Sequence, residues 1–99
     1  MPKTVPHPFL AEQRQKIDEI DRRLVSLLAQ RFAVTTAVGE YKATHGLPSR
    51  DPTREQDQDR ELRAWAAAAG LGPDLASGVL RLILDEVVRA HDVRKGKTA

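Results

Sequence analysis

Cysteine is absent from the 99 residues of this sequence, and histidine is scarce. Without cysteine, the chain has no disulfide framework and no thiolate ligands for a metal ion. The three histidines, His7, His45 and His91, are scattered along the chain, with no pair at the spacing of metal ligands. The sequence therefore argues against a metalloenzyme and predicts no metal site.

Aromatic residues and charge of one sign are in short supply as well. The chain has one Trp, one Tyr and two Phe, and its 16 Lys and Arg residues nearly balance 14 Asp and Glu residues, for a formal net charge of +2. Nucleic-acid binders usually carry a strongly basic surface, and those that bind single strands also stack bases on aromatic side chains. We therefore expect no nucleic-acid partner.

Long apolar runs and glycine-rich motifs are missing too. No segment approaches the ~20 apolar residues of a membrane span, and the first residues lack the apolar core of a signal peptide. We therefore expect a cytoplasmic protein without a membrane partner. The sequence contains no phosphate-binding loop, no dinucleotide-binding turn and no nucleophile elbow. Hydrolytic and redox enzymes depend on such motifs, so neither class is expected.

Proline is absent between Leu10 and Thr44, and this stretch contains one glycine, Gly39. The stretch predicts one uninterrupted helix, with apolar residues repeating every three or four positions. At ~1.5 Å per residue the helix would be about 52 Å long, whereas a compact domain of this size has a radius of gyration of about 13 Å. The rest of the chain can form only two short helices, which cannot cover so long a stripe. We therefore expect a second copy of the chain beside it, in an intertwined homodimer.

Local signals place two shorter helices after the first one. In chain order these signals are Gly46, Pro48, Asp51, Pro52, Gly70 and Gly72-Pro73-Asp74. Gly46 and Pro48 end the long helix. Asp51 is an N-cap, and Pro52 follows it at the first helical position of the second helix. Gly70 ends the second helix, and Gly72-Pro73-Asp74 opens the third. The predicted fold class is all-α with three helices per chain: a flexible lead-in at 1–8, a helical domain at 9–92 and a basic flexible tail at 93–99.

Three cations, Arg14, Arg31 and Lys42, stand on the apolar stripe of the long helix, where a helical bundle would have aliphatic residues. Arg31 is seven residues from both Leu24 and Val38. A buried unpaired guanidinium is energetically unfavourable, so Arg31 needs a carboxylate partner or an anionic ligand, unless its stem carries the charge out to solvent. A structural ion pair and a ligand site both remain open at this point.

The spacing of these cations limits which of them can share a ligand. Lys42 lies roughly 16 Å from Arg31 by helical rise, so their long side chains could close on one small molecule. Arg14 lies roughly 25 Å beyond Arg31 in the other direction, too far to reach that molecule within one chain. We therefore expect Arg14 to act in the site of the partner subunit, with antiparallel long helices and two equivalent sites.

Further polar side chains follow on the other two predicted helices. Arg54 and the amides of the helix start could bind an anion, Glu55 could accept a hydrogen bond from a hydroxyl, and Asp51 fits an ordinary cap. His91 shares a face with Leu84, where a core histidine with satisfied hydrogen bonds is the simpler interpretation. Such fixed cations suit a flexible polyanion, which they would orient while stabilising separating charge, without covalent catalysis.

These residues resemble a known family, the all-α class of chorismate mutases, in order and spacing. The matching elements are Arg14-x-x-Ile17-Asp18-x-x-Asp21-x-x-Leu24-x-x-Leu27-Leu28-x-x-Arg31, then Val38-Gly39-x-x-Lys42, then Arg50-Asp51-x-x-Arg54-Glu55. The resemblance covers about residues 10 to 92. It implies an isomerase of aromatic amino-acid biosynthesis, which converts chorismate to prephenate with no cofactor and no covalent intermediate.

The resemblance also implies roles for the cations. Arg31 and the partner's Arg14 would bind the two carboxylates of chorismate, and Arg54 would add positive charge nearby. Lys42 would donate to the ether oxygen, whose negative charge grows as the C–O bond breaks.

The remaining implied site residues are Asp51, Glu55, Val87 and His91. Glu55 and the backbone region of Asp51 would hold the ring hydroxyl. The best-known family pattern has a serine where this chain has Val87, which removes one donor near a carboxylate, and a glutamine at the ether oxygen where this chain has His91. An imidazole there predicts a rate that depends on pH, because its charge changes near neutrality.

Relatives on the same fold are alternatives, acting on isochorismate by pyruvate elimination or on 4-amino-4-deoxychorismate by rearrangement. The intact Asp51-x-x-Arg54-Glu55 element favours a mutase over a lyase, but an amino group could replace the hydroxyl opposite Glu55. From another class, the chain could be a non-catalytic helical dimerisation or regulatory module, with Arg31 and Lys42 in structural ion pairs. A partner enzyme of the same pathway could also dock on the dimer.

Overall fold

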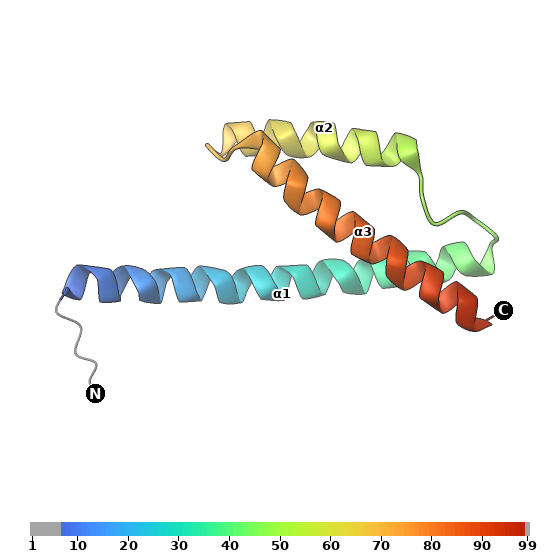
Figure 1. Ribbon diagram of the computed structural model, residues 1–99, viewed down its shortest axis with the longest axis horizontal. Coiled ribbons are helices and arrows are strands. Elements are labelled where there is room, and N and C mark those ends of the chain that lie inside the picture. The colour runs from blue at the N-terminus through green and yellow to red at the C-terminus, as the bar shows by residue number, and fades with distance from the viewer. Residues whose placement is uncertain (1–6, 99) are drawn as a thin grey trace. The chain divides into compact units, whose positions relative to one another are not determined.

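The computed structural model describes the backbone of residues 7–98 and the side chains of residues 7–93. It contains the helices α1 (Pro8–Thr44), α2 (Pro52–Ala68) and α3 (Pro73–Thr98), and no strand within this described range (Figure 1). The predicted all-α fold class with one long and two shorter helices is therefore confirmed. No helix of the described part has both the length and the apolar character needed to cross a membrane.

Helix α1 is 37 residues long and begins two residues before the predicted start. Proline is tolerated in the first turn of a helix, where its missing N–H has no intrahelical partner, so Pro8 does not prevent this extension. The predicted lead-in at 1–8 otherwise lies largely outside the described residues. The chain forms two compact units, whose boundary falls between Val34 and Thr35 inside α1.

Two glycines end the first two helices in the left-handed conformation. Gly46 has φ +66° and Gly70 has φ +78°. In each case the next N–H returns to the helix: Leu47 donates to the carbonyl of Lys42 over 2.9 Å, and Leu71 donates to that of Ala66 over 2.8 Å. This is the Schellman type of helix end. A Cβ built on Gly46 or Gly70 would meet nothing within 4 Å, so backbone handedness alone selects glycine there.

Helix α2 begins as its sequence predicts. Asp51 is the N-cap residue, in an extended conformation, and Pro52 occupies the first turn. The Oδ1 atom of Asp51 accepts a hydrogen bond from the backbone N–H of Arg54 over 3.1 Å. This bond satisfies one of the donors that every helix start leaves free, and it fixes where the first turn of α2 lies.

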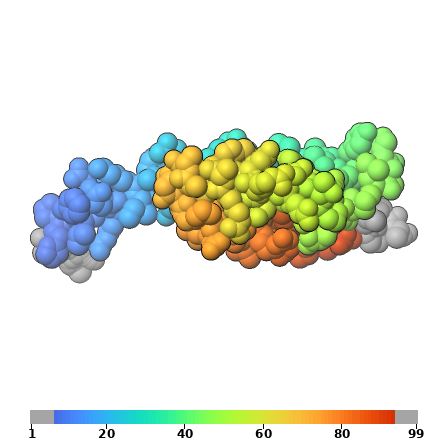
Figure 2. Space-filling model, turned by 90° about the horizontal axis from the view of Figure 1, so that it is seen from above, coloured from blue at the N-terminus to red at the C-terminus, as the bar shows by residue number. Residues whose placement is uncertain are grey.

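Helices α2 and α3 pack side by side in the second unit (Figures 1 and 2). Their buried apolar residues are Ala66, Ala76 and Leu80. Ser77 of α3 donates a hydrogen bond to Asp59 of α2, and Arg63 ion-pairs with the same carboxylate at 2.9 Å. These two partners, Ser77 first, lower the pKa of Asp59 below its usual value. The small core of this hairpin is thus supplemented by polar contacts.

The apolar stripe of α1 is exposed in the single chain. Ile17 is 53% exposed, Leu24 52% and Leu27 60%. Large apolar side chains at such exposure along one helix are unusual for a monomeric protein and typical of a surface that another molecule covers. Trp65 of α2 is 65% exposed as well.

Helix α3 extends into residues 93–99, the segment for which the sequence predicts a basic flexible tail. The helix continues to Thr98, whereas the sequence predicts fraying from about Val93. Beyond Val93 the structure describes only the backbone, up to Thr98.

Candidate functional site

The predicted residues of the second unit come from the end of α1, the start of α2 and the C-terminal half of α3. Lys42 lies in the last turn of α1 and is half-buried. Asp51 caps α2, so Arg54 and Glu55 fall in its first turn. Val87 is half-buried on α3, one turn before His91.

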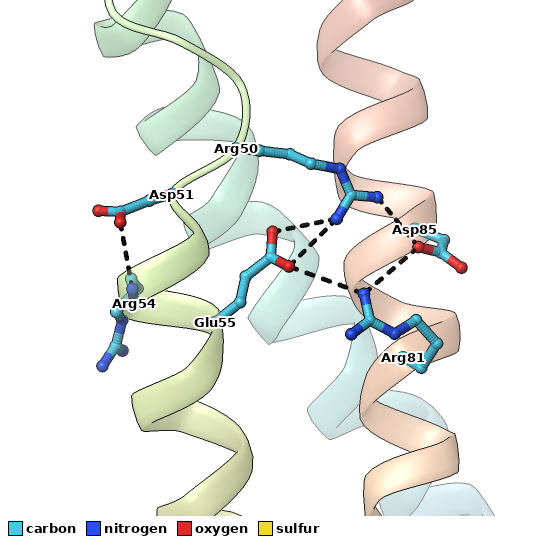
Figure 3. Close-up of polar contacts among 6 residues, drawn as sticks. All are labelled: Arg50, Asp51, Arg54, Glu55, Arg81 and Asp85. Carbon is cyan, nitrogen blue, oxygen red and sulfur yellow. Dashed lines mark hydrogen bonds and ion pairs between the residues drawn. The ribbon is translucent and has the colours of Figure 1, made fainter.

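Arg54 and Glu55 point to different sides of α2, as consecutive residues of a helix do. Figure 3 shows the Arg54 side chain on the side of the helix away from Glu55, whose carboxylate faces α3. Arg54 is exposed, whereas the Glu55 side chain is 17% exposed. The structure therefore does not bring the Arg54 guanidinium and the Glu55 carboxylate together.

The Glu55 carboxylate is bound by cations that the sequence analysis did not assign to the site (Figure 3). Nη1 of Arg50 donates to both of its oxygens, at 3.1 and 3.2 Å. Nη2 of Arg50 also donates to Asp85 of α3 over 3.2 Å. Arg81 of α3 lies 3.7 Å from Glu55 and 3.9 Å from Asp85. We call these four residues, Arg50, Glu55, Arg81 and Asp85, the Glu55 cluster.

The sequence alone does not predict the contacts of the Glu55 cluster. Arg50 belongs to the Arg50-Asp51-x-x-Arg54-Glu55 element, but the element does not say that the first residue pairs with the last. Arg81 and Asp85 stand four residues apart on α3, a spacing that indicates only a surface ion pair within one helix. That four-residue spacing of opposite charges is the signal in the sequence that points to Arg81 and Asp85.

His91 is 4% exposed, and its Nε2 atom has no hydrogen-bond partner among the described residues. The sequence-based interpretation of a core histidine with satisfied hydrogen bonds therefore does not describe this nitrogen. A buried ring nitrogen without a partner is unfavourable, and such groups mark places where a ligand or water completes the hydrogen bonding. Asp92, the next residue, accepts a hydrogen bond from Ser49 of the α1–α2 loop over 2.7 Å.

Arg14 and Arg31 lie on the first unit. Arg14 is exposed on α1. Arg31 is half-buried, and its Nη1 atom is inaccessible to solvent with no hydrogen-bond partner within the described part of the chain. Burial of a guanidinium nitrogen without a hydrogen bond is unfavourable, and an anionic partner would offset that cost.

An open groove of about 360 Å³ borders the Glu55 cluster, between α2 and α3. Its lining residues are Pro52, Glu55, Gln56, Asp59, Arg60 and Arg81. The groove includes neither Lys42 nor His91, so it does not by itself gather the predicted site. Over residues 7–98, the structure contains no group of three His, Asp or Glu side chains placed to hold a metal ion.

Comparisons with known proteins give the family context of these residues. A family model described as chorismate mutase type II matches residues 13–92. The T-protein of Enterobacter agglomerans is 37% identical over 89 residues, which cover 90% of this chain and 24% of the relative. The chorismate mutase of Methanocaldococcus jannaschii is 47% identical over 56 residues, covering 54% of this chain and 57% of the relative.

A third relative is named for another activity. The 4-amino-4-deoxychorismate mutase of Streptomyces venezuelae is 28% identical over 85 residues, covering 85% of this chain and 82% of the relative. The chain thus spans about a quarter of the T-protein but most of this shorter relative.

Proposed function

Because the chain belongs to the chorismate mutase type II family, we propose that it catalyses the rearrangement of chorismate to prephenate. The observation that carries this proposal is the Nη1 atom of Arg31, which is buried and has no hydrogen-bond partner within the described residues. A cation in that state gains most from an anionic ligand, and chorismate is a dicarboxylate. The exposed Arg14 of the partner subunit would bind the second carboxylate of the substrate.

The reaction breaks a C–O bond and forms a C–C bond within one molecule, so the protein has no covalent step to perform. Lys42 would donate to the ether oxygen, where negative charge develops, and Arg54 would add positive charge near the carboxylates. Holding the reactive conformation and stabilising that charge are the two contributions expected of such a site, each worth several kcal/mol.

The ring hydroxyl and the ether oxygen would engage the other site residues. Glu55 and the backbone region of Asp51 would hold the hydroxyl. The unpartnered Nε2 atom of His91 supports a contact of this residue with the substrate, at the ether oxygen. Val87 offers no hydrogen bond, so carboxylate binding would rely on the arginines.

A homodimer is part of this proposal. The exposed stripe of α1, with Ile17, Leu24 and Leu27 each more than half exposed, supports burial against a second copy. The same dimer would bring the partner's Arg14 to each site. We expect the dimer to act in the cytoplasm, and a partner enzyme of the same pathway could dock on it.

The direct test is incubation of the purified chain with chorismate while the loss of chorismate is followed. We expect turnover, and we expect Arg31→Ala to lower kcat/KM by about 100-fold or more, as removal of a charge-stabilising group does. Arg22→Ala is the matched control, because Arg22 of the same helix pairs with Glu19 on the surface at 2.8 Å. Equal turnover in the parent and in Arg31→Ala would refute the proposal.

A second candidate substrate is 4-amino-4-deoxychorismate, the compound for which the Streptomyces venezuelae relative is named. It differs from chorismate by an amino group in place of the ring hydroxyl. The turnover rates of the two compounds, measured under the same conditions, would decide between them. A chain that turned over neither compound would fit the alternative of a non-catalytic helical module.

A further inference from the structure

The Glu55 cluster contains two cations and two carboxylates in mutual contact. Arg50 contacts Glu55 at 3.1 Å and Asp85 at 3.2 Å, while Arg81 lies within 4 Å of both. We propose that Arg50 and Arg81 determine substrate specificity, by making Glu55 an acceptor for a neutral ring hydroxyl rather than a counter-ion for a ring ammonium. This inference rests on the proposed function.

The charge balance of the cluster carries the first step of the argument. A lone carboxylate would attract an ammonium group strongly, because the two opposite charges would meet without competition. At Glu55 two guanidinium groups already neutralise the carboxylates, so the cluster has no net charge. Arg50 and Arg81 would therefore offset part of the attraction that Glu55 and Asp85 exert on an added ammonium.

A hydroxyl group meets different conditions at the same carboxylate. An ionised carboxylate has about four lone-pair directions, and the two contacts from Arg50 leave acceptor capacity on Glu55. A hydroxyl carries no net charge, so the nearby guanidinium groups do not repel it. The cluster therefore weakens the contact with an amino compound, which is protonated near neutral pH, more than the contact with an alcohol.

Burial makes this discrimination stronger at Glu55 than on the open surface. The Glu55 side chain is 17% exposed, whereas Arg50, Arg81 and Asp85 are 45–57% exposed. Water and salt screen the charges least around the least exposed member. A ring substituent that reaches Glu55 thus encounters the fields of both guanidinium groups.

The contacts also fix where the carboxylate lies. Arg50 precedes α2, Glu55 lies in its first turn, and Asp85 lies on α3, so Arg50 ties α2 to α3 through two carboxylates. Arg50 and Arg81 are therefore positioning residues, which act on the substrate through Glu55. A purely structural role would stabilise the α2–α3 hairpin but would leave the choice between the two substrates unchanged.

The test compares kcat/KM for chorismate and for 4-amino-4-deoxychorismate in each variant. In Arg50→Gln and in Arg81→Gln we expect the ratio of the two values to shift toward the amino compound by about two- to fivefold, the scale of one charge pair near the surface. Arg81→Lys, which keeps the charge, should retain the parental ratio. If turnover of the amino compound is too slow to follow, its inhibition constant against chorismate replaces its kcat/KM.

Arg89→Gln is the matched control. Arg89 lies two turns after Arg81 on α3 and pairs with Glu86 at 2.6 Å rather than with Glu55. The ratio is internal to each preparation, so partial loss of folded protein lowers both values and leaves the ratio unchanged.

The outcomes separate this inference from the proposed function. A parent that turns over chorismate, with the same ratio in both glutamine variants, overturns the inference alone. A parent that prefers the amino compound also overturns it. A parent that turns over neither compound refutes the proposed function, and the specificity argument with it.

Discussion

Ser49 donates a hydrogen bond to Oδ1 of Asp92 over 2.7 Å, and the two residues are 43 positions apart in the chain. The bond ties the loop that leads into α2 to the turn of α3 that carries His91. Asp51 and Glu55 follow within six residues of Ser49, so one contact couples two of the three segments that carry the candidate site residues of the second unit.

Loss of this contact should loosen the loop. In Ser49→Ala we expect the free energy of unfolding to fall by about 1 kcal/mol or less, as for one hydrogen bond near the surface. For a chain of this size that corresponds to a lower melting temperature by up to about 8 °C. Thermal unfolding followed by circular dichroism measures the change. Ser26→Ala, at an exposed position of α1, is the control and should leave the melting temperature within about 2 °C of the parent.

A shared site predicts complementation between two inactive variants. Arg14→Ala and Arg31→Ala should each lose most activity, but a mixed dimer contains one site with both arginines intact. After subunit exchange in an equal mixture, half of the dimers are mixed and each has one working site, so activity should return to about a quarter of the parental value. A mixture that stays as inactive as its components after confirmed exchange would argue against a site shared between subunits.

The role proposed for His91 predicts a pH-dependent rate. Histidine is the residue type whose charge commonly changes between about pH 5 and 8, whereas glutamine has no titratable group. We expect kcat/KM of the parent to vary across this range and that of His91→Gln to vary less. The measurement is a pH–rate profile of both proteins with chorismate. A profile no flatter in the variant would exclude the imidazole as that donor.

The lowered pKa of Asp59 predicts a loss of stability in acid. Hydrogen bonds from Ser77 and Arg63 favour the ionised form of Asp59 in the folded state. This carboxylate therefore stabilises the fold at pH values above its unfolded pKa of about 3.9, and the contribution disappears as the pH falls through the lower folded value. The melting temperatures of the parent and Asp59→Asn should differ most near neutral pH and converge below about pH 4.

Glu61→Gln serves as the control for that comparison. Glu61 is exposed on the same helix, and we expect its variant to follow the parent across the pH range. An Asp59→Asn protein that loses stability in acid as steeply as the parent would contradict the assignment of this contribution to Asp59.

Features set by neighbouring residues could be predicted from the sequence. The Asp51 cap with Pro52, and the helix ends at Gly46 and Gly70, depend on the conformational preferences of residues within one turn, and the structure confirms each of them. The basic flexible tail at 93–99 stays a prediction, because basic residues alone do not determine whether a last turn frays.

Contacts between distant parts of the chain were harder to predict. Arg50 and Asp85 are 35 positions apart, and only the packing of α2 against α3 brings them together. The opposed directions of Arg54 and Glu55 follow from helical geometry, yet the sequence does not say which of them faces α3. The roles of Arg14, Arg31, Lys42 and His91 in catalysis stay predictions.

The left-handed conformation at Gly46 and Gly70 has a consequence for chemical synthesis. Because a Cβ at either position would meet nothing within 4 Å, the obstacle to a side chain there is chirality and not space. An L-alanine would strain the backbone, whereas a D-alanine, the mirror-image residue, adopts positive φ without strain. The D-alanine also reduces the number of conformations open to the unfolded chain. A synthetic chain with D-alanine at both helix ends should therefore be more stable than the natural one, while its L-alanine counterpart is less stable.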